Sequence, residues 1–222
     1  MSRNTPWVGW LGVAALLLML AGSFVGLFVV GADVEQGEVQ RLMYVHVPAA
    51  WTAFVSFFVV FVCSVLYLVQ RDLRADRIAA SAAAAGVVFI SLTLATGMLW
   101  GKPTWGVWWT WDPRLTTTAI LLSIFIGYLA VRGFADEAEQ RARWSAIIGI
   151  LGFVQVPIVY LSVIWWRTLH QPPSSPRSVS SEILAAWMLN FVAFLFVFAY
   201  LTARGVRLAR VEAELDERMA YD

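Results

Sequence analysis

Six long stretches of the chain contain no charged residue, and this spacing constrains the fold more than any other feature. They lie between the charged residues at positions 3 and 33, 41 and 71, 77 and 102, 114 and 132, 143 and 167, and 182 and 204, and they contain 29, 29, 24, 17, 23 and 21 residues. A helix needs about 20 mostly apolar residues to cross the hydrocarbon core of a bilayer. Lipid admits only helices and closed barrels, and the alternating segments typical of barrel strands are absent from the sequence. The sequence therefore predicts an all-α membrane protein with six transmembrane helices.

The expected helices form one transmembrane domain over residues 1–203, followed by a cytoplasmic tail over 204–222. We expect the spans at residues 9–30, 49–69, 78–100, 115–131, 144–165 and 183–203, with an outer tryptophan-rich loop over 100–116. The apolar core of the first span is longer than the roughly 7–15 residues of a cleavable signal peptide, which predicts a retained anchor. Pro157 predicts a kink in the fifth helix, and the tail is expected to extend the sixth.

Lysine and arginine are distributed unevenly between the two sides of the membrane. With the N-terminus inside, the inner segments hold eleven of the sixteen basic residues and the outer loops hold five. This bias predicts that both termini lie in the cytoplasm. A net charge of +1 and the lack of a basic tract give no indication of nucleic-acid binding. The single cysteine, Cys63, excludes an intramolecular disulfide and is expected to be a small buried side chain.

One outer segment, WGVWWTWD at residues 105–112, concentrates tryptophan. Nine of the twelve tryptophans fall near the outer boundary of the membrane and three near the inner one. An aromatic belt at the headgroups would place tryptophans at both faces of the membrane, so it accounts for only part of this asymmetry. A cluster of rigid indoles predicts an apolar platform for a large, flat ligand. The indoles of this segment are Trp105, Trp108, Trp109 and Trp111.

The acidic residue that ends the segment has a structural explanation. Asp112 followed by Pro113 is a typical helix start, with the aspartate as N-cap and the proline at the first helical position. A capping role does not exclude a functional one, because a cap also fixes the loop relative to the helix.

The only two histidines, His46 and His170, fall on either side of this segment at the outer boundary, one just before the second span and one just after the fifth. A hydrogen-bonded interface residue is one interpretation of each. A zinc site would need three or four close ligands, whereas two histidines from separate loops suit a six-coordinate haem iron. The haem carboxylates would then need cations, and Arg114 and Lys102, which flank the tryptophans, are favoured. The complete set of outer cations is Arg41, Lys102, Arg114, Arg167 and Arg177.

These segments together resemble a known family. WGVWWTWD resembles the tryptophan-rich signature of haem-handling membrane proteins. The flanking segments MYVHVPAAW (residues 43–51) and WWRTLHQP (residues 165–172) resemble the histidine-bearing segments of one branch, the haem exporter protein C (CcmC) family of cytochrome c maturation. The similarity runs through all six spans, and the length fits this short branch better than the larger haem lyase subunits.

The resemblance implies a multi-pass protein of the bacterial inner membrane that holds non-covalent haem b at the periplasmic face. It implies that His46 and His170 are the axial iron ligands and that the tryptophan motif with Asp112 helps to bind haem. It also implies delivery of haem to the membrane-anchored chaperone CcmE, alongside the ATP-binding-cassette complex CcmA/CcmB and the single-span subunit CcmD. Such a chain is a transfer protein, surrounded by membrane lipid, and needs no catalytic residue of its own.

Two other functions remain open at this point. A b-type electron-transfer subunit would also use histidine ligands, but it usually buries them within helices to bridge the bilayer. An intramembrane hydrolase would need a nucleophile and a base at membrane depth, and the sequence offers no convincing pair.

Overall fold

The computed structural model is a bundle of long helices, and it describes residues 6–135, 137–172 and 179–219, apart from the side chains of residues 216 and 217. Within that part, six helical segments are long and apolar enough to cross a membrane, which confirms the predicted all-α fold with six transmembrane helices. The elements are α1 (Pro6–Phe24), the π-helical turn η1 (Val25–Val29), the 3-10 turn η2 (Glu38–Leu42), α2 (Met43–Gln70), α3 (Leu73–Trp105), α4 (Pro113–Val131), α5 (Ala138–Phe153), α6 (Gln155–Trp165) and α7 (Ser181–Met219).

Several helices extend beyond their expected boundaries. The second span begins with α2 at Met43 rather than at residue 49, and α3 ends at Trp105 rather than at residue 100. The last helix continues to Met219, so the described part of the tail extends the sixth span, as expected. Polar residues at a helix end can remain in water while the helix continues, and charge-free gaps therefore underestimate helix length.

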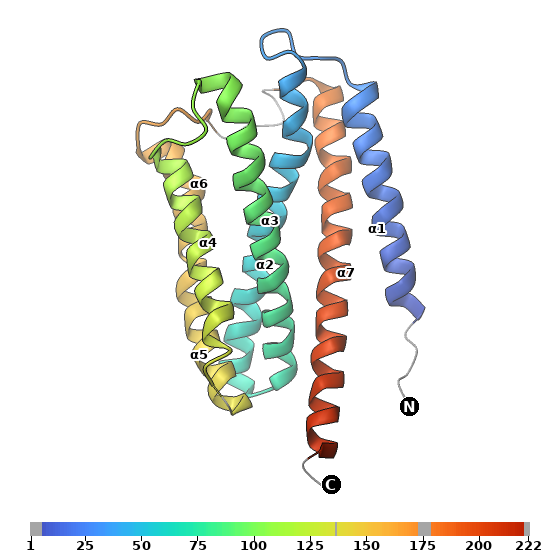
Figure 1. Cartoon of the computed structure of the whole chain (residues 1–222), viewed down its shortest axis with the longest axis vertical. Helices are drawn as coiled ribbons and strands as arrows, with labels where there is room; N and C mark the ends of the chain where they lie inside the picture. Colours follow the sequence, from blue (N-terminus) through green and yellow to red (C-terminus); the bar gives the residue numbers. More distant parts are fainter. Residues whose placement is uncertain (1–5, 136, 173–178, 220–222) are drawn as a thin grey trace.

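The two ends of the bundle carry different connections. Pro6 at the start of α1 and Met219 at the end of α7 lie at the same end (Figure 1), together with the α2–α3 turn and the α4–α5 connection. We call this the inner end. The opposite, outer end carries the segments 30–37, 106–112 and 166–172. All the segments that the sequence singles out for function therefore meet at one end.

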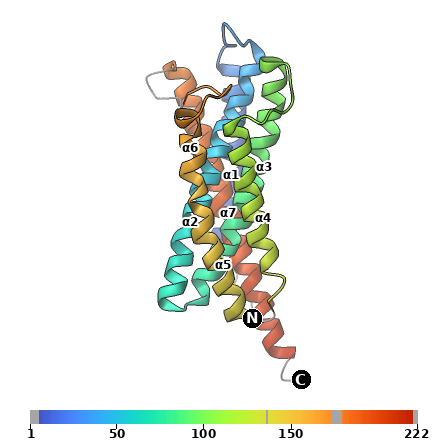
Figure 2. The ribbon, with the colours of Figure 1, turned by 90° about the vertical axis from the view of Figure 1, so that its left-hand side faces the viewer.

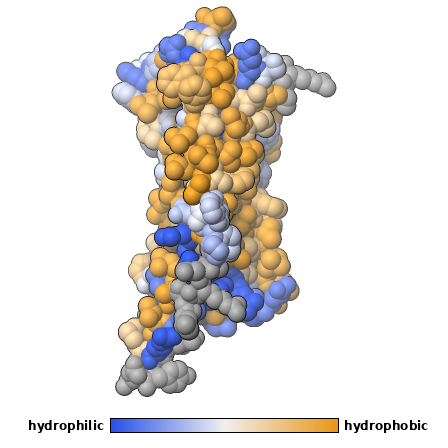
Figure 3. Space-filling model, turned by 90° about the vertical axis from the view of Figure 1, so that its right-hand side faces the viewer, coloured by the Kyte–Doolittle hydropathy of each residue, from blue (hydrophilic) through white to orange (hydrophobic). Residues whose placement is uncertain are grey.

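The helices α2 and α3 pack along each other at the centre of the bundle. The views in Figures 1 and 2 place α7 and α1 on one side of this pair and α4, α5 and α6 on the other. The helix α1 packs mainly against α7, and most of its side chains are exposed. Figure 3 shows an apolar band on this side of the molecule between more hydrophilic ends, which suits contact with lipid.

A polar contact joins α1 to α7 inside the apolar region. The buried Asn190 side chain donates a hydrogen bond to the Gly22 carbonyl at 3.1 Å. A β-carbon on Gly22 would lie only 2.6 Å from Asn190 Oδ1, so the close approach of the helices requires glycine there. Small residues and interhelical hydrogen bonds are how helices associate in lipid, where burial of apolar surface gives little driving force.

The middle of the bundle is a tightly packed apolar layer. The rings of Phe57 on α2 and Phe125 on α4 stack with their centroids 3.8 Å apart at an interplanar angle of 17°. Ile90, Leu121 and Val60 complete the layer, and all five side chains are fully buried. This layer separates the outer half of the bundle from the inner half.

The fifth span is broken into α5 and α6 at Val154. Pro157 has no N–H group, and its ring conflicts with the carbonyl of Phe153, four residues earlier, so the helix cannot continue regularly. The predicted kink is confirmed. Gln155 donates a hydrogen bond to the Thr117 carbonyl at 3.0 Å, which holds the start of α6 against α4.

At the inner end, a buried ion pair joins α3 to the end of α4. The Arg132 guanidinium donates to both carboxylate oxygens of Asp76, at 2.6 and 2.8 Å. Both side chains are largely buried. Two parallel bonds of this kind fix both the distance and the orientation of the two groups.

We predict that Asp76→Ala lowers the free energy of unfolding by about 3–5 kcal/mol, because it leaves the Arg132 charge buried without a partner. The measurement is denaturant unfolding of the protein in detergent. The double variant Asp76→Leu/Arg132→Met should recover much of the loss, and Arg143→Ala, at an exposed inner position, should change little. A loss for Asp76→Ala no larger than that of Arg143→Ala would contradict the assigned role of the ion pair.

Candidate functional site

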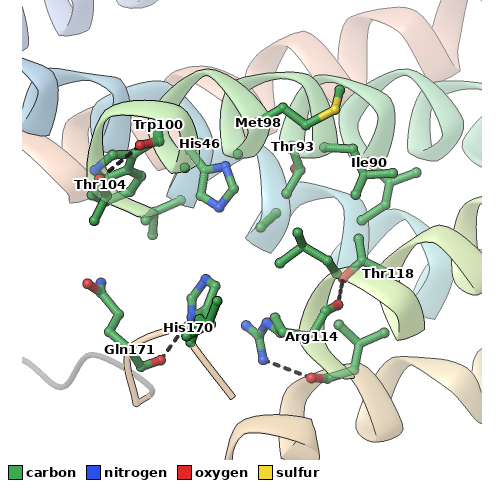
Figure 4. A pocket seen from close by; sticks show the side chains of 18 of the residues that line it. His46, Ile90, Thr93, Met98, Trp100, Thr104, Arg114, Thr118, His170 and Gln171 are labelled. Carbon is green, nitrogen blue, oxygen red and sulfur yellow. Dashed lines mark hydrogen bonds between the residues drawn. The ribbon is translucent and has the colours of Figure 1, made fainter. Parts of the chain in front are cut away.

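A cavity of about 460 Å³ lies at the outer end of the bundle between α2, α3, α4, α6 and the segment after α6 (Figure 4). Its rim includes the exposed residues Thr104, Gln171 and Pro172. Cofactor and small-molecule sites typically enclose roughly 300–1,000 Å³ and are mostly apolar with a few polar groups. The size and the lining of this cavity fit that description.

The cavity ends at the packed middle layer. Phe54 and Ile90 belong to its deepest wall, and the stacked pair Phe57 and Phe125 lies directly beyond Phe54 along the bundle. None of the described residues that line the cavity belongs to the inner end. Access is therefore from the outer half of the bundle.

His46 lies in the first turn of α2, not in a loop, so this part of the sequence prediction is wrong. At the start of this helix Met43 and Tyr44 are buried against Val30 and Trp187, contacts that an apolar count does not detect. His46 Nδ1 lies 3.1 Å from the Thr96 hydroxyl oxygen on α3. A β-carbon on Gly97 would lie 3.1 Å from His46 Cε1, so glycine at this position gives the imidazole room against α3.

The hydrogen bonds around Thr96 favour one tautomer of His46. The Thr96 hydroxyl donates its single hydrogen to the Leu92 carbonyl at 2.7 Å, so it can only accept a hydrogen bond from the histidine. His46 Nδ1 therefore carries the proton and Nε2 has the free lone pair. A ring held in this way by its other nitrogen is the usual arrangement for a metal-ligating histidine.

His170 lies in the segment after α6 and lines the cavity from the opposite wall, as Figure 4 shows. Its Nδ1 donates a hydrogen bond to the Gln171 carbonyl at 2.9 Å, which again leaves Nε2 unprotonated. Its ring also meets the Trp105 indole, with centroids 6.5 Å apart. Burial lowers the pKa of His170 from its ordinary value of 6.5, because it disfavours the charged form.

The two imidazoles therefore each have a free Nε2 atom. Among the described residues, neither Nε2 has a hydrogen-bond partner, and both rings line the same cavity. No group of three or more metal-ligating side chains occurs in the described part of the chain. The arrangement is thus a pair of neutral nitrogen ligands facing a shared, mostly apolar space.

The structure divides the four tryptophans of the motif into two pairs. Trp105 and Trp109 line the cavity, whereas Trp108 and Trp111 do not and are 54% and 80% exposed. Trp105 is the last residue of α3, so the loop begins at Gly106 rather than at residue 100. The indoles of Trp109 and Trp111 still touch edge to face, with centroids 5.7 Å apart. One pair thus forms a wall and the other faces outward.

Asp112 is the N-cap of α4, as predicted, and accepts a hydrogen bond from the Arg114 backbone N–H at 2.8 Å. It does not line the cavity. The buried carboxylate also accepts from the Thr168 hydroxyl and from the Leu169 backbone N–H, both at 2.7 Å. Asp112 thus connects the tryptophan motif to the segment that carries His170.

Of the outer cations, Arg114 is the one that lines the cavity among the described residues. It donates to the carbonyls of Val159 and Tyr160 at 2.8 and 3.1 Å. Lys102 instead donates to the Gly106 carbonyl, and Arg41 donates to carbonyls at the end of the first span. Arg167 is exposed and does not line the cavity, and Arg177 lies outside the described residues.

Sequence reasoning missed several residues that shape the site: Gln36, Thr96, Gly97, Trp100 and Thr168. Gln36 accepts a hydrogen bond from the Trp100 indole at 2.8 Å, and Trp100 meets the His46 ring edge to face. These contacts join residues far apart in the chain. No local pattern in the sequence marks them.

Comparison with known proteins gives a consistent result. The family model described as "Heme exporter protein C" matches residues 1–221. The chain belongs to the haem exporter protein C family. It is 35% identical over 210 residues to the heme exporter protein C of Bradyrhizobium diazoefficiens, which covers 93% of this chain and 78% of the relative.

Two further relatives give similar values. The Escherichia coli heme exporter protein C is 33% identical over 202 residues, covering 90% of this chain and 82% of the relative. A putative cytochrome c biosynthesis ccmC-like mitochondrial protein of Marchantia polymorpha is 35% identical over 192 residues, covering 84% and 82%. The resemblance that the sequence motifs suggested is confirmed.

We predict that His170 titrates below pH 6.5 in the ligand-free protein, because its partly buried imidazole resists protonation. The unfolded chain takes up this proton more readily, so the contribution of His170 to stability is lost as the pH falls from 6.5 through the folded-state pKa. Histidine-selective NMR in detergent measures this value, and His46→Gln assigns the remaining signal, since the chain has two histidines. A midpoint at or above 6.5 would contradict the burial of His170.

Proposed function

We propose that this protein binds non-covalent haem b in the outer cavity, with His46 and His170 as the axial iron ligands, and delivers it to the chaperone CcmE during cytochrome c biogenesis. The membership of the haem exporter protein C family supports the coarser part of this proposal, haem delivery for cytochrome c biogenesis. The identity of the iron ligands and the direction of delivery are argued from the geometry of the cavity.

The observation that carries the proposal is the pair of imidazoles. Both are neutral, both have their Nδ1 hydrogen-bonded to oxygen, and both have a free Nε2 at the same cavity. The porphyrin supplies four nitrogen ligands to its iron, so two protein ligands from opposite walls complete six-coordination. The described residues offer no third ligand that would suit zinc instead.

The other residues that line the cavity suit the porphyrin ring and the carboxylates of haem. Trp105, Trp109 and Leu115 provide flat and apolar surface for the porphyrin ring. Arg114 is the cation within reach of a haem carboxylate at the cavity, and its carbonyl contacts use one guanidinium nitrogen, which leaves other N–H groups free to donate. The protein thus contributes position, exclusion of water and charge compensation.

The orientation in the membrane follows from the basic residues. Among the described residues, ten basic side chains lie in the segments at the inner end and four at the outer end. We therefore assign the inner end to the cytoplasm, with both termini, and the cavity to the periplasmic face of the bacterial inner membrane. The packed layer below the cavity argues that haem reaches the site from the outer half of the bilayer or from the periplasm, and not through this chain.

Delivery needs contact with an acceptor at the open rim. The exposed Trp108 and Trp111 offer an apolar surface beside the cavity where CcmE could dock. Among the described residues that line the cavity, no nucleophile is hydrogen-bonded to a base, which favours a transfer protein over an enzyme. The ATP-binding-cassette complex CcmA/CcmB and the single-span subunit CcmD are the expected neighbours within the membrane.

A b-type electron-transfer subunit is the alternative. Such a protein needs cofactors that bridge the bilayer, whereas both histidines here lie in the outer half, above the packed Phe57–Phe125 layer. Slow reduction of the bound haem by a quinol would favour delivery over electron transfer.

We predict that the purified protein, supplied with haem, has the low-spin absorption spectrum of bis-histidine iron. His46→Ala and His170→Ala should each give a high-spin or haem-free spectrum, because each removes one axial ligand. Ser123→Ala, on the exposed face of α4, is the matched control and should leave the spectrum unchanged. An unchanged low-spin spectrum in both histidine variants would overturn the ligand assignment.

We predict that the two tryptophan pairs separate binding from transfer. Trp105→Ala/Trp109→Ala should weaken haem retention, because these indoles line the cavity. Trp108→Ala/Trp111→Ala should keep haem but capture less CcmE in a pull-down, because these indoles face outward. Equal effects of the two double variants on haem content would contradict the division.

A further inference from the structure

We propose that Asp112 and Thr168 are positioning residues that hold His170 against the cavity, a role distinct from capping α4. The inference rests on the proposed function, since it assigns a purpose to the placement of one ligand. It is carried by the hydrogen bonds that the Thr168 hydroxyl and the Leu169 backbone N–H donate to one buried carboxylate.

The contacts form a continuous chain from α4 to the ligand. The Thr168 hydroxyl donates to the Asp112 carboxylate, at 2.8 Å from Oδ1 and 2.7 Å from Oδ2. The same hydroxyl oxygen accepts a hydrogen bond from the His170 backbone N–H at 3.0 Å. The Leu169 backbone N–H donates to Asp112 Oδ2 at 2.7 Å. Two consecutive residues of the ligand segment are therefore tied, directly or through Thr168, to Asp112.

The segment around His170 has little else to hold it in place. The helix α6 ends at Trp165, and Trp166, Arg167, Leu169 and Gln171 are exposed. Thr168 and His170 are only partly buried, so side-chain burial gives the backbone little support there. The Asp112 carboxylate, which is itself buried, is the rigid point that this segment shares with the start of α4.

The chemistry of the carboxylate suits such a fixed point. Among the described residues Asp112 has no salt bridge, since the neighbouring Arg114 guanidinium contacts the carbonyls of Val159 and Tyr160. Its charge is instead stabilised by backbone N–H groups and by the N-terminus of α4. Hydrogen bonds to a charged group are shorter and about twice as strong as neutral ones. A carboxylate acceptor thus holds the segment more firmly than an amide would.

The variant Asp112→Asn separates capping from positioning. Its amide oxygen can take the place of Oδ1 and still accept from the Arg114 N–H, so α4 keeps its cap. Its NH2 group then occupies the place of Oδ2 and faces the Leu169 N–H, donor against donor. The variant Thr168→Val removes the hydroxyl and retains the shape of the side chain. Thr168→Ser restores the hydroxyl, and Ser123→Ala is the control for loss of a hydroxyl elsewhere.

The first measurement uses the haem-free protein. Amide hydrogen exchange of the peptide that contains Leu169 and His170 reports whether the Asp112 contacts protect these N–H groups. We expect exchange on the order of tenfold faster in Asp112→Asn and Thr168→Val, the factor for one lost hydrogen bond to a charged group. Thr168→Ser and Ser123→Ala should exchange as the wild type does.

The second measurement uses the haem-loaded, reduced protein with carbon monoxide as the probe. Carbon monoxide would have to displace one of the two histidines, so its binding rate reports how readily a ligand leaves the iron. A rise that is specific to variants of Asp112 and Thr168 assigns the change to His170, because of the two histidine segments these residues contact only that of His170. We expect a rate on the order of tenfold higher in Asp112→Asn and Thr168→Val, with Thr168→Ser close to wild type.

The outcomes distinguish this inference from the proposed function. Exchange and carbon monoxide binding that match the wild type in both Asp112→Asn and Thr168→Val would overturn the positioning role while the haem site stands. A wild-type protein that takes up no haem would overturn the proposed function, and hydrogen exchange alone would then decide whether Asp112 and Thr168 hold the segment. If Asp112→Asn fails to fold, Thr168→Val, which leaves the cap untouched, gives the decisive comparison.

Discussion

The lack of hydrogen-bonding solvent in the hydrocarbon core is the constraint on which this structure depends. It forces the backbone into six helices, and it also governs the polar side chains between them. Hydroxyl groups such as those of Ser56 and Thr93 donate hydrogen bonds to carbonyls of their own helix. Thr96 does the same, and for that reason it presents only an acceptor to His46. The protonation pattern of the candidate ligand is therefore a consequence of the membrane environment.

Much of the fold could be predicted from the sequence because it follows from local properties. Charge-free gaps give the number of helices, Asp112–Pro113 gives the start of α4, and Pro157 gives the break in the fifth span. The motifs also identify the family, which the comparisons confirm. In each case the residues that decide the feature are adjacent in the chain or repeat along one helix.

The detail of the site could not be predicted because it depends on contacts between distant segments. His46 lies inside α2 and not before it, and its partner Thr96 is 50 residues away. Asp112 meets Thr168 across a separation of 56 residues. The division of Trp105 from Trp108 depends on where α3 ends and how the next loop turns. Composition predicts an aromatic platform, but only the path of the chain decides which indoles form it.

The packed layer around Phe57 and Phe125 has a further consequence for the cell. A cavity that is wide enough for a large cofactor and open at one membrane face would conduct protons if water could pass through it to the other face. Fully buried aromatic and aliphatic side chains fill the bundle below the deepest wall. A cavity closed in this way can stay open at one face of a membrane without giving protons a path to the other face.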